Sequence, residues 1–585
     1  MGGCFSKPKP VELKIEVVLP EKEPSAGGKG SPRAYQGNGT ARHFHAEERL
    51  PAPHPYAGTQ DCVEAAVCHV KDLENGQMRE VELGWGKVLL VKDNGEFHAL
   101  GHKCPHYGAP LVKGVLSRGR VRCPWHGACF NISTGDLEDF PGLDSLHKFQ
   151  VKIEKEKVYV RASKQALQLQ RRTKVMAKCI SPSAGHGGST NVLIVGAGSA
   201  GLVCAETLRQ EGFSDRIVLC TLDRHLPYDR PKLSKVVTVD VRNKKVVFKD
   251  GFKLEYSKLL LAPGSSPRTL SCKGKEVENV FTIRTPEDAN RVVRLARGRN
   301  AVVVGAGFLG MEVAASLAEK AHSVSVVELE ETPFRRFLGE RVGRALMKMF
   351  ENNHVKFYMQ TELSELRAHE GKLKEVVLKS SKVVRADVCV VGIGAVPATS
   401  FLKQSGITLD SRGFIPVNKM MQTNVPGVFA AGDAVTFPLA WRNNRKVNIP
   451  HWQMAHAQGR VAAQNMLAQE AEISTVPYLW TAMFGKSLRY AGYGEGFDDV
   501  IIQGDLEELK FVAFYTKGDE VIAVASMNYD PIVSKVAEVL ASGRAIRKRE
   551  AVCATQQDRR HVLAHRERLL GSSAADLGKH QGQRL

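Results

Sequence analysis

The spacing of apolar and polar residues divides the chain into stretches of different secondary structure. Short β-prone runs separated by turn residues, such as residues 86–91, predict a small all-β domain over residues 61–162. Apolar strands then alternate with helical repeats from residue 191, which predicts α/β structure with parallel sheets. A last stretch of strands followed by one helix predicts an α+β domain over residues 476–546. The chain is therefore expected to be multidomain.

Three stretches lack this periodicity, and no folded domain is expected in them. Residues 1–60 are rich in proline and contain a glycine and serine cluster, a composition typical of disorder. Residues 163–190 are basic at first and then small and polar, and we expect a linker there. The tail, residues 547–585, is rich in Gln, Arg, His and Ser and is expected to be disordered apart from a short helix near residues 562–570.

Composition sets the scale of the molecule and limits its partners. A chain of 585 residues is too long for one hydrophobic core, and its longest apolar run has only the length of a strand. Twelve irregularly spaced cysteines do not fit a disulfide scaffold and indicate a reducing compartment. Lys and Arg number 82 against 62 Asp and Glu, but these basic residues lie in linkers and tail without interleaved aromatic residues. Nucleic acid is therefore not expected as a partner.

The first residues of the chain, MGGCFS, match the pattern for N-myristoylation on Gly2, and Cys4 could carry a second acyl chain. One myristoyl chain binds membranes only marginally, so the second chain or contact of Lys7 and Lys9 with anionic lipid would be needed. The alternative is a chance match in an unstructured segment. The pattern thus predicts a possible anchor on a cytosol-facing membrane and does not resemble a secretory signal.

Two short motifs each combine one cysteine and one histidine. Cys104 and His106 form the first pair, and Cys123 and His126 form the second after sixteen intervening residues. A zinc site is the alternative, but zinc motifs usually place two cysteines two to four residues apart. A [2Fe–2S] cluster with two Cys on one iron and two His on the other needs two loops of this composition. With the adjacent residues 107–111, these loops resemble a Rieske domain, and the resemblance implies that the four residues are metal ligands.

The resemblance also indicates the reduction potential of the cluster. High-potential Rieske proteins carry an additional cysteine in each loop, whereas Ala109 and Trp125 stand at those positions here. The loops are similar to the ferredoxin type, which implies a potential at the low end of the Rieske range, about −150 mV.

Two glycine motifs predict two dinucleotide-binding folds. The strand Val192–Val195 leads into Gly196, Gly198 and Gly201 and then a helix, and Asp223 after the next strand could hold ribose hydroxyls. The pattern recurs with Gly305, Gly307, Gly310 and Glu328. An acid in that place favours NADH, since NADPH would require an arginine for its 2′-phosphate. Arg335 and Arg336 lie further along the chain and leave this preference open.

The tandem folds, with the second inserted in the first, resemble the two-dinucleotide flavoproteins of the pyridine-nucleotide oxidoreductase family. The resemblance implies an FAD-binding domain over residues 191–299 and 416–475 and an NAD-binding domain over residues 300–415. Residues 261–264 (LAPG), followed by Arg268, resemble the family segment where these domains meet. Gly432 and Asp433 resemble its second FAD motif, in which the Asp hydrogen-bonds the ribityl chain.

Residues 226–235 lack the cysteine pair of the disulfide reductases in this family. They resemble instead the ferredoxin and rubredoxin reductases and the apoptosis-inducing factors, which places Arg230 and Lys235 at the FAD. The resemblance implies that Lys235 pairs with Glu312 beside the flavin N5, where a cation would stabilise reduced flavin. A surface ion pair is the alternative. Trp480 falls in a segment that flanks the isoalloxazine in relatives, although it could be a core residue.

A Rieske domain joined to this reductase resembles the apoptosis-inducing-factor-like proteins. The predicted function is electron transfer from NADH through FAD to the chain's own [2Fe–2S] cluster and on to an unknown acceptor. The family implies cell-death activity and a mitochondrial association, which an acyl anchor would place on the outer surface. The alternative is a signalling protein with a vestigial redox activity. A Rieske oxygenase would need a mononuclear iron, and the FAD and NAD motifs already fill the C-terminal region.

Two features depart from this family. Relatives carry a further helix and strand of about 30 residues after Lys235, the size of part of a βα unit, whereas Val236 follows at once here. Loss of that strand would expose an edge of the FAD sheet and weaken FAD binding. The sequence after residue 550 does not end like a compact domain. Both features are typical of a splice variant or an imperfect gene model.

Overall fold

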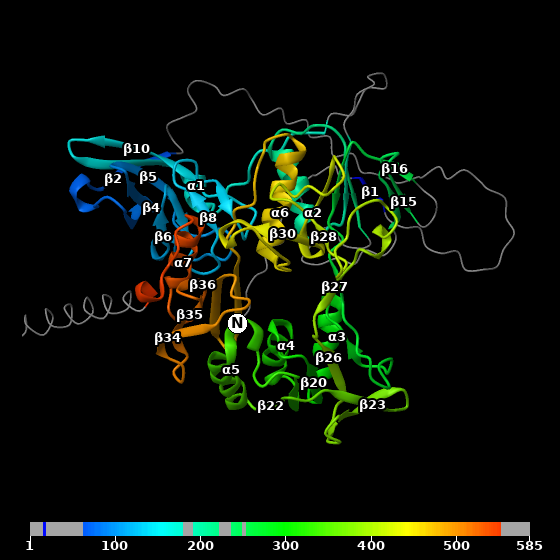
Figure 1. The fold of residues 1–585 in the computed structure, drawn as a ribbon. Helices are drawn as coiled ribbons and strands as arrows, with labels where there is room; N and C mark the ends of the chain where they lie inside the picture. Colours follow the sequence, from blue (N-terminus) through cyan, green and yellow to red (C-terminus); the bar gives the residue numbers. More distant parts are fainter. Residues whose placement is uncertain (1–15, 19–61, 180–190, 222–235, 249–252, 552–585) are drawn as a thin grey trace, which may run out of the picture.

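The computed structural model describes residues 16–18, 62–179, 191–221, 236–248 and 253–551 (Figure 1). Seven residues with predicted roles lie outside these ranges: Gly2, Cys4, Lys7, Lys9, Asp223, Arg230 and Lys235. The short helix predicted near residues 562–570 also lies outside them. Among the described residues, no helix combines the length and the apolar character needed to cross a membrane.

Residues 62–179 form the β unit, drawn in blue and cyan in Figure 1. Its first sheet has the order β2-β11-β10-β5-β4-β3, and the predicted run 86–91 lies within β4. These strands are β2 (Cys62–His69), β3 (Gln77–Leu83), β4 (Gly86–Asp93), β5 (Glu96–Gly101), β10 (Lys148–Glu154) and β11 (Lys157–Ser163). The second sheet consists of β6 (Val115–Ser117), β7 (Arg120–Arg122), β8 (Cys129–Asn131) and β9 (Leu137–Asp139). Both sheets are antiparallel, as expected for a small all-β domain.

The first part of the predicted linker is folded onto the β unit. Ser163 caps the short helix α1 (Lys164–Gln168) by accepting a hydrogen bond from the Ala166 amide (3.1 Å). Further along, the Arg172 guanidinium lies 2.5 Å from an Asp136 carboxylate oxygen. Arg171 and Lys174 also lie near acids of the β unit, Arg171 at 3.5 Å from Asp144 and Lys174 at 3.9 Å from Asp136. The described part of the predicted linker is thus held against the β unit by ion pairs.

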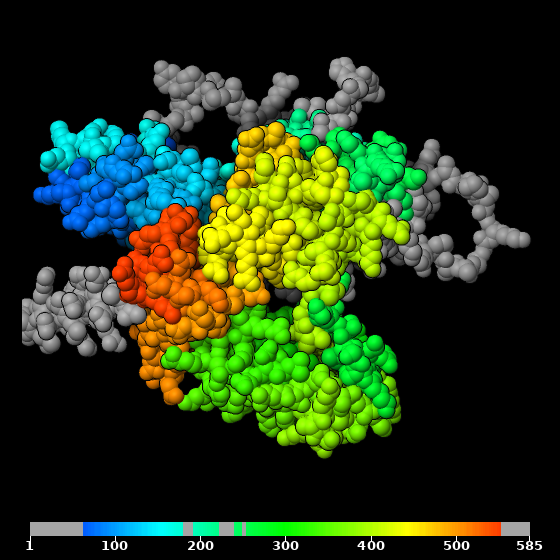
Figure 2. All heavy atoms as spheres, in the orientation of Figure 1, coloured from blue at the N-terminus to red at the C-terminus, as the bar shows by residue number. Residues whose placement is uncertain are grey.

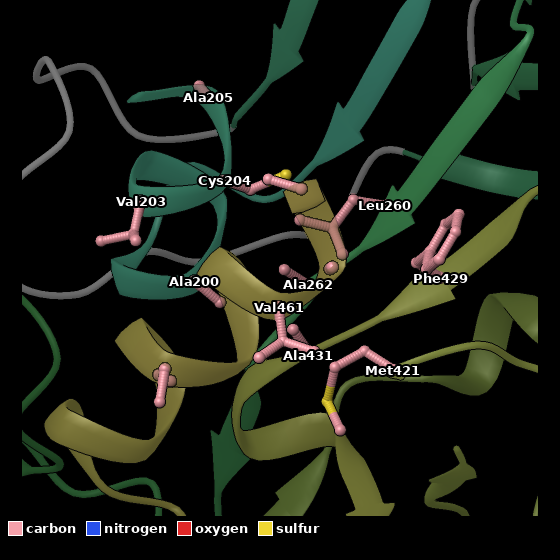
Figure 3. Packing of buried hydrophobic residues seen from close by; sticks show 14 of the residues in the cluster. Ala200, Val203, Cys204, Ala205, Leu260, Ala262, Met421, Phe429, Ala431 and Val461 are labelled. Carbon is pink, nitrogen blue, oxygen red and sulfur yellow. The ribbon is translucent and has the colours of Figure 1, made fainter. Parts of the chain in front are cut away.

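The first α/β unit is built on a parallel sheet of order β1-β13-β12-β17-β29. The strands are β1 (Glu16–Val18), β12 (Val192–Val195), β13 (Ile217–Cys220), β17 (Lys258–Leu261) and β29 (Val428–Ala430). Helices α2 (Ser199–Gln210) and α6 (Trp452–Met466) pack beside it, where Cys204 and Val461 meet the sheet residues (Figure 3). A Cβ on Gly459 would lie 2.3 Å from the Ala200 carbonyl oxygen, so the two helices touch through their backbones. A small antiparallel sheet of β14 (Val236–Asp240), β15 (Lys245–Phe248) and β16 (Lys253–Glu255) completes the unit.

Strand β1 comes from the segment for which no folded structure was predicted. It pairs in parallel with β13, with Glu16 opposite Val218 and Val18 opposite Cys220. The sequence predicted an exposed sheet edge because a strand after Lys235 is missing. In the structure, the N-terminal segment occupies the position beside β13 and pairs with its backbone.

The second α/β unit, drawn in green, has a parallel sheet of order β19-β26-β20-β21-β22. These strands are β19 (Val280–Phe281), β20 (Asn300–Val304), β21 (Ser323–Val327), β22 (Val355–Tyr358) and β26 (Val388–Val391). The helices are α3 (Pro286–Ala296), α4 (Phe308–Ala318) and α5 (Arg335–Asn352). The two α/β units are joined where β18 (Ser265–Pro267) pairs antiparallel with β27 (Ala395–Pro397).

The C-terminal unit, residues 476–551, lies between the β unit and the second α/β unit, as the orange and red spheres in Figure 2 show. Its sheet has the order β32-β33-β36-β35-β34 and is antiparallel. The strands are β32 (Tyr478–Met483), β33 (Lys486–Gly492), β34 (Asp499–Asp505), β35 (Lys510–Lys517) and β36 (Glu520–Met527). Helix α7 (Ile532–Ala541) follows and packs on β33 and β6. The C-terminal unit therefore contacts the edge of the β unit that carries the Cys–His loops.

Candidate functional site

The two Cys–His loops have the same backbone construction. In the first loop the Cys104 amide donates to the Ala109 carbonyl (2.9 Å), and in the second the Cys123 amide donates to the Ala128 carbonyl (2.7 Å). Each loop also contains a glycine with positive φ, Gly108 at 77° and Gly127 at 78°, a conformation that other residues rarely adopt. The two similar turns direct the Cys and His side chains of both loops toward the same region.

The four predicted metal ligands converge in two pairs. The Nδ1 atoms of His106 and His126 lie 3.1 Å apart, and the thiols of Cys104 and Cys123 hydrogen-bond to each other. That hydrogen bond raises the pKa of Cys104 and lowers the pKa of Cys123. Burial lowers the pKa of His106 to about 4 and that of His126 to about 3, so both imidazoles are neutral and able to bind metal.

This donor set suits a cluster of two irons better than a single metal. Within the described part of the chain, no three His, Cys, Asp or Glu side chains are placed to hold one metal ion. Two thiolates on one iron and two imidazoles on the other is the ligand arrangement of a Rieske [2Fe–2S] centre. The residues present therefore fit this cluster.

Trp480, in β32 of the C-terminal unit, lies directly against the histidine pair. Its ring centroid is 4.6 Å from that of His126 and 5.9 Å from that of His106. On another side it meets His451, which precedes α6 of the first α/β unit, at 5.6 Å. The sequence predicted that Trp480 flanks the flavin. The structure places it between the cluster loops and the first α/β unit.

The second loop is also bound to the C-terminal unit through its backbone. The Ser534 hydroxyl donates to the Cys123 carbonyl (3.0 Å), and the Arg489 guanidinium donates to the Trp125 carbonyl (2.8 Å). A Cβ on Gly127 would lie 2.7 Å from the Tyr478 ring, so the loop and that ring are in close contact. Sequence motifs gave no signal for Ser534 or Arg489, because neither belongs to a recognisable local pattern.

The first glycine turn and the second FAD motif meet in the first α/β unit. A Cβ on Gly201 would lie 1.8 Å from the Gly196 carbonyl oxygen, so only glycine allows helix α2 to start against this turn, and Gly198 is the N-cap of that helix. Gly432 packs against Ala200 of the same helix, with 3.6 Å between the Ala200 Cβ and the position of a Cβ on Gly432. One site is thus lined by the glycine turn, the N-terminus of α2 and Gly432. A pyrophosphate bound there could come close to the backbone amides.

Two further predicted FAD residues are positioned by hydrogen bonds. The Asp433 carboxylate accepts a hydrogen bond from the Ser265 hydroxyl (2.9 Å), which joins the motif at 261–264 to the Gly432 turn. The Arg268 amide donates to the Gly394 carbonyl (3.0 Å), next to the pairing of β18 with β27. Arg268 therefore lies at the junction of the two α/β units, as the sequence predicted for this segment.

The second glycine turn leaves an open cradle at the start of α4. A Cβ on Gly310 would lie 1.9 Å from the Gly305 carbonyl oxygen, whereas a Cβ on Gly307 would meet no atom within 4 Å. The Glu328 carboxylate follows β21 and accepts hydrogen bonds from the amides of Ala306 (2.5 Å) and Leu329 (2.7 Å). The space above Gly307 and the acid beside the turn fit a dinucleotide.

Three predicted residues near these sites engage other partners. Glu312 is exposed and accepts a hydrogen bond from the Thr481 hydroxyl (2.6 Å), next to Trp480. Its predicted partner Lys235 lies outside the described residues, so their pairing stays a prediction. Arg335 and Arg336 form ion pairs with acidic neighbours, Arg335 with Glu340 at 3.1 Å and Arg336 at 3.2 Å from a Glu330 oxygen.

Three family models match successive parts of the chain. Residues 63–150 match the Rieske [2Fe-2S] domain, and residues 478–563 match the reductase C-terminal domain. Pyridine nucleotide-disulphide oxidoreductase matches in two segments, residues 190–239 and 234–459, which meet where a stretch was predicted to be missing. The chain is therefore an FAD- and NAD-dependent oxidoreductase that carries a Rieske [2Fe–2S] domain.

Relatives define the family more narrowly. The chain is 90% identical to apoptosis-inducing factor 3 of Homo sapiens over 584 residues, which cover 94% of this chain and 96% of the human protein. It is 89% identical to apoptosis-inducing factor 3 of Mus musculus, with the same coverage. The chain belongs to the apoptosis-inducing factor 3 family. Since the human alignment spans 584 positions but 94% of the 585 residues, part of it lies opposite gaps in this chain.

Solved structures share the reductase part of the fold. The ferredoxin reductase of the CYP199A2 system from Rhodopseudomonas palustris aligns with a TM-score of 0.58 and 26% identity, covering 61% of this chain and 96% of that one. The covalent putidaredoxin reductase–putidaredoxin complex aligns with a TM-score of 0.57 and 25% identity, covering 61% and 94%. Rubredoxin-NAD(+) reductase of Pseudomonas putida is 28% identical over 58% of this chain and 95% of its own length. These likenesses support an oxidoreductase of the ferredoxin-reductase type.

Proposed function

We propose that the protein passes electrons from NADH through FAD to its own Rieske cluster and then to an acceptor outside the chain. The observation that carries this proposal is the place of Trp480, which touches both cluster histidines and, through His451, the helix of the first α/β unit. FAD, when bound, accepts a hydride from NADH and releases electrons singly. A single chain that holds both sites side by side needs no encounter between two proteins for this step.

The residues of the chain bind and orient the cofactors in this scheme. The cradle at Gly307 and the turn of Gly305 and Gly310 would hold the NADH pyrophosphate, with Glu328 on the ribose side. Arg335 and Arg336 are engaged by glutamates, which supports NADH over NADPH. Gly196, Gly198, Gly201, Gly432 and Asp433 would hold FAD. Asp223, Arg230 and Lys235 keep their predicted roles at the FAD, with Lys235 and Glu312 proposed as the catalytic pair beside the flavin.

Replacing Trp480 with alanine should slow the reduction of the cluster by NADH. The ring fills the space between His126 and His451, and its loss leaves a gap that electrons must cross. We expect the rate to fall at least about tenfold, which corresponds to about 1.4 kcal/mol in the barrier. Anaerobic stopped-flow spectra would follow flavin and cluster bleaching separately.

The matched control is Trp85→Ala, since Trp85 is 98% exposed on the β unit. Both variants should keep a cluster that dithionite reduces normally. A Trp480→Ala protein in which NADH reduces flavin and cluster at wild-type rates would contradict the proposed route.

Cell-death signalling with a vestigial redox activity is the second candidate, favoured by the name of the relatives at 90% and 89% identity. A double variant, Cys104→Ser with Gly196→Ala, removes a cluster thiolate and strains a turn whose φ is 119°. If electron transfer is the biological role, this variant should lose its effect in a cell-viability assay. Wild-type killing by a protein without cluster or FAD would favour signalling instead.

We further propose a mitochondrial location with the chain on the outer, cytosol-facing surface, reached through acylation of Gly2 and Cys4. The pattern at residues 1–6 and the apoptosis-inducing factor 3 relatives support this location. The domain limits proposed from the sequence are 61–162, 191–299 with 416–475, 300–415 and 476–546.

A further inference from the structure

Three arginines of the β unit converge on one carboxylate of the C-terminal unit. Glu538, on helix α7, lies 2.5 Å from the Arg122 Nε, 2.9 Å from an Arg120 nitrogen and 3.1 Å from an Arg118 nitrogen. Arg120 and Arg122 belong to β7, and Arg118 lies in the turn before it. We call this set of four residues the Glu538 cluster. Each of the three ion pairs that Glu538 forms with these arginines crosses from one unit to the other.

The Glu538 cluster is buried at its centre. The side chains of Arg122 and Glu538 are 1% and 4% exposed. Burial alone would raise the pKa of Glu538, but the charges of Arg122 and Arg120 outweigh it and lower that pKa to about 2. The carboxylate is therefore ionised throughout the neutral range, and the pair does not weaken until the solution is strongly acidic. Removing one partner of such a pair leaves an uncompensated buried charge.

Arg122 connects this cluster to the second cluster loop. It directly precedes the ligand Cys123, and its Nη1 donates to the Gly127 carbonyl at the far end of the same loop (2.8 Å). The same nitrogen lies 3.2 Å from an Asp139 carboxylate oxygen. Arg122 thus joins the start of the loop, through its own backbone, to the end of the loop, through its hydrogen bond to Gly127. Its Nε at the same time donates to Glu538. Movement of α7 away from β7 would release the loop that carries Cys123 and His126.

We propose that Glu538 is a positioning residue for electron transfer within the chain. By holding Arg122, it fixes the second loop against the C-terminal unit and keeps His126 in contact with Trp480. The Rieske domain then works as a docked part of the reductase and not as a carrier that detaches during turnover. This inference rests on the proposed function for its electron-transfer step, but the docking that it requires can be measured without NADH.

Hydrogen exchange of the full-length holoprotein tests the docking. In Glu538→Gln, amides of residues 122–128 and of α7 should exchange about thirtyfold faster or more, the effect of about 2 kcal/mol expected when a buried charge pair across an interface is truncated. The amides of the first loop, Cys104–Ala109, should change less. The control is Glu508→Gln, whose side chain is exposed in the same unit.

The same proteins test the electron transfer. Glu538→Gln should keep its iron content and a dithionite-reduced cluster, whereas NADH should reduce the cluster at least about tenfold more slowly than in the wild type. If Glu538→Gln does not fold, Arg118→Gln serves in its place, because Arg118 lies at the partly exposed edge of the Glu538 cluster. It should show faster hydrogen exchange and slower cluster reduction, each by about threefold, the size expected for a partly exposed ion pair.

Each result separates the docking from the proposed function. Unchanged exchange of the second loop in a folded Glu538→Gln protein would overturn the docking role. Faster exchange with a wild-type rate of cluster reduction would overturn the role in electron transfer. A wild-type protein whose cluster dithionite reduces but NADH does not would overturn the proposed function, while the exchange result would still decide the docking.

Discussion

Replacing Cys104 with serine should abolish the [2Fe–2S] cluster while leaving the flavin in place. Cys104 is 2% exposed and shares a hydrogen bond with Cys123, so both thiols face the site. A serine oxygen is a harder ligand than a thiolate sulfur, and a hydroxyl ionises less readily than a thiol. Serine therefore does not suit iron–sulfur ligation. Substituting residues that hydrogen-bond to metal ligands typically lowers metal affinity roughly 10–100-fold, and loss of a ligand itself should have a larger effect. Iron analysis and electron paramagnetic resonance of the dithionite-reduced protein would measure it.

Cys68→Ser is the matched control, because Cys68 is a partly buried free thiol in β2 of the same unit. It should retain the cluster. NADH should still bleach the flavin bands of the Cys104→Ser protein, but electrons should no longer reach an acceptor by way of the cluster. Retention of stoichiometric iron and an unchanged resonance spectrum in Cys104→Ser would refute the assigned ligand set.

Alanine at Gly201 should weaken the binding of FAD, and alanine at Gly310 should weaken the binding of NADH. The added Cβ would lie 1.8 Å from the Gly196 carbonyl oxygen in the first case and 1.9 Å from the Gly305 carbonyl oxygen in the second. Either helix must move off its turn, and overpacking of this kind costs about 1–3 kcal/mol. Gly201→Ala should therefore lose FAD, and Gly310→Ala should keep FAD but bind NADH about tenfold more weakly or worse.

The two variants control each other because the local geometry of the turns is almost the same. Flavin content by absorbance and NADH affinity by titration of the purified proteins would be measured for both. Cluster content should be normal in each, since the β unit is untouched. Unchanged NADH affinity in a folded Gly310→Ala protein would mean that the second turn does not form the NADH site.

The sequence predicted those parts of the site that depend on residues close together in the chain. Glycine spacing, the flanking strand and helix, and a Cys–His pair are all local, because the turn that they require is formed by a handful of consecutive residues. The geometry of Gly201 and Gly310 and the matching turns of the two loops therefore agree with the expected constructions. The fold class followed from the same local periodicities.

Contacts between distant segments could not be predicted in this way. Glu538 and Arg122 are 416 positions apart, and a lone glutamate on an amphipathic helix carries no sign of its partner. Trp480 was predicted from family resemblance to lie at the flavin, yet nothing local shows that its ring also meets His126. Strand β1 was missed because three residues in a proline-rich segment have no periodicity and gain their pairing only from the β13 edge.

The hydrogen bond from Ser534 to Cys123 joins residues 411 positions apart and therefore imposes an order on biosynthesis. At about 5–20 residues per second, the ribosome needs about 20–80 s to travel from the second loop to helix α7. During that interval the β unit has emerged, but neither Ser534 nor Glu538 exists to cover the loop. The contacts of the second loop with Ser534, and of Arg122 with Glu538, can therefore form only when translation is nearly complete.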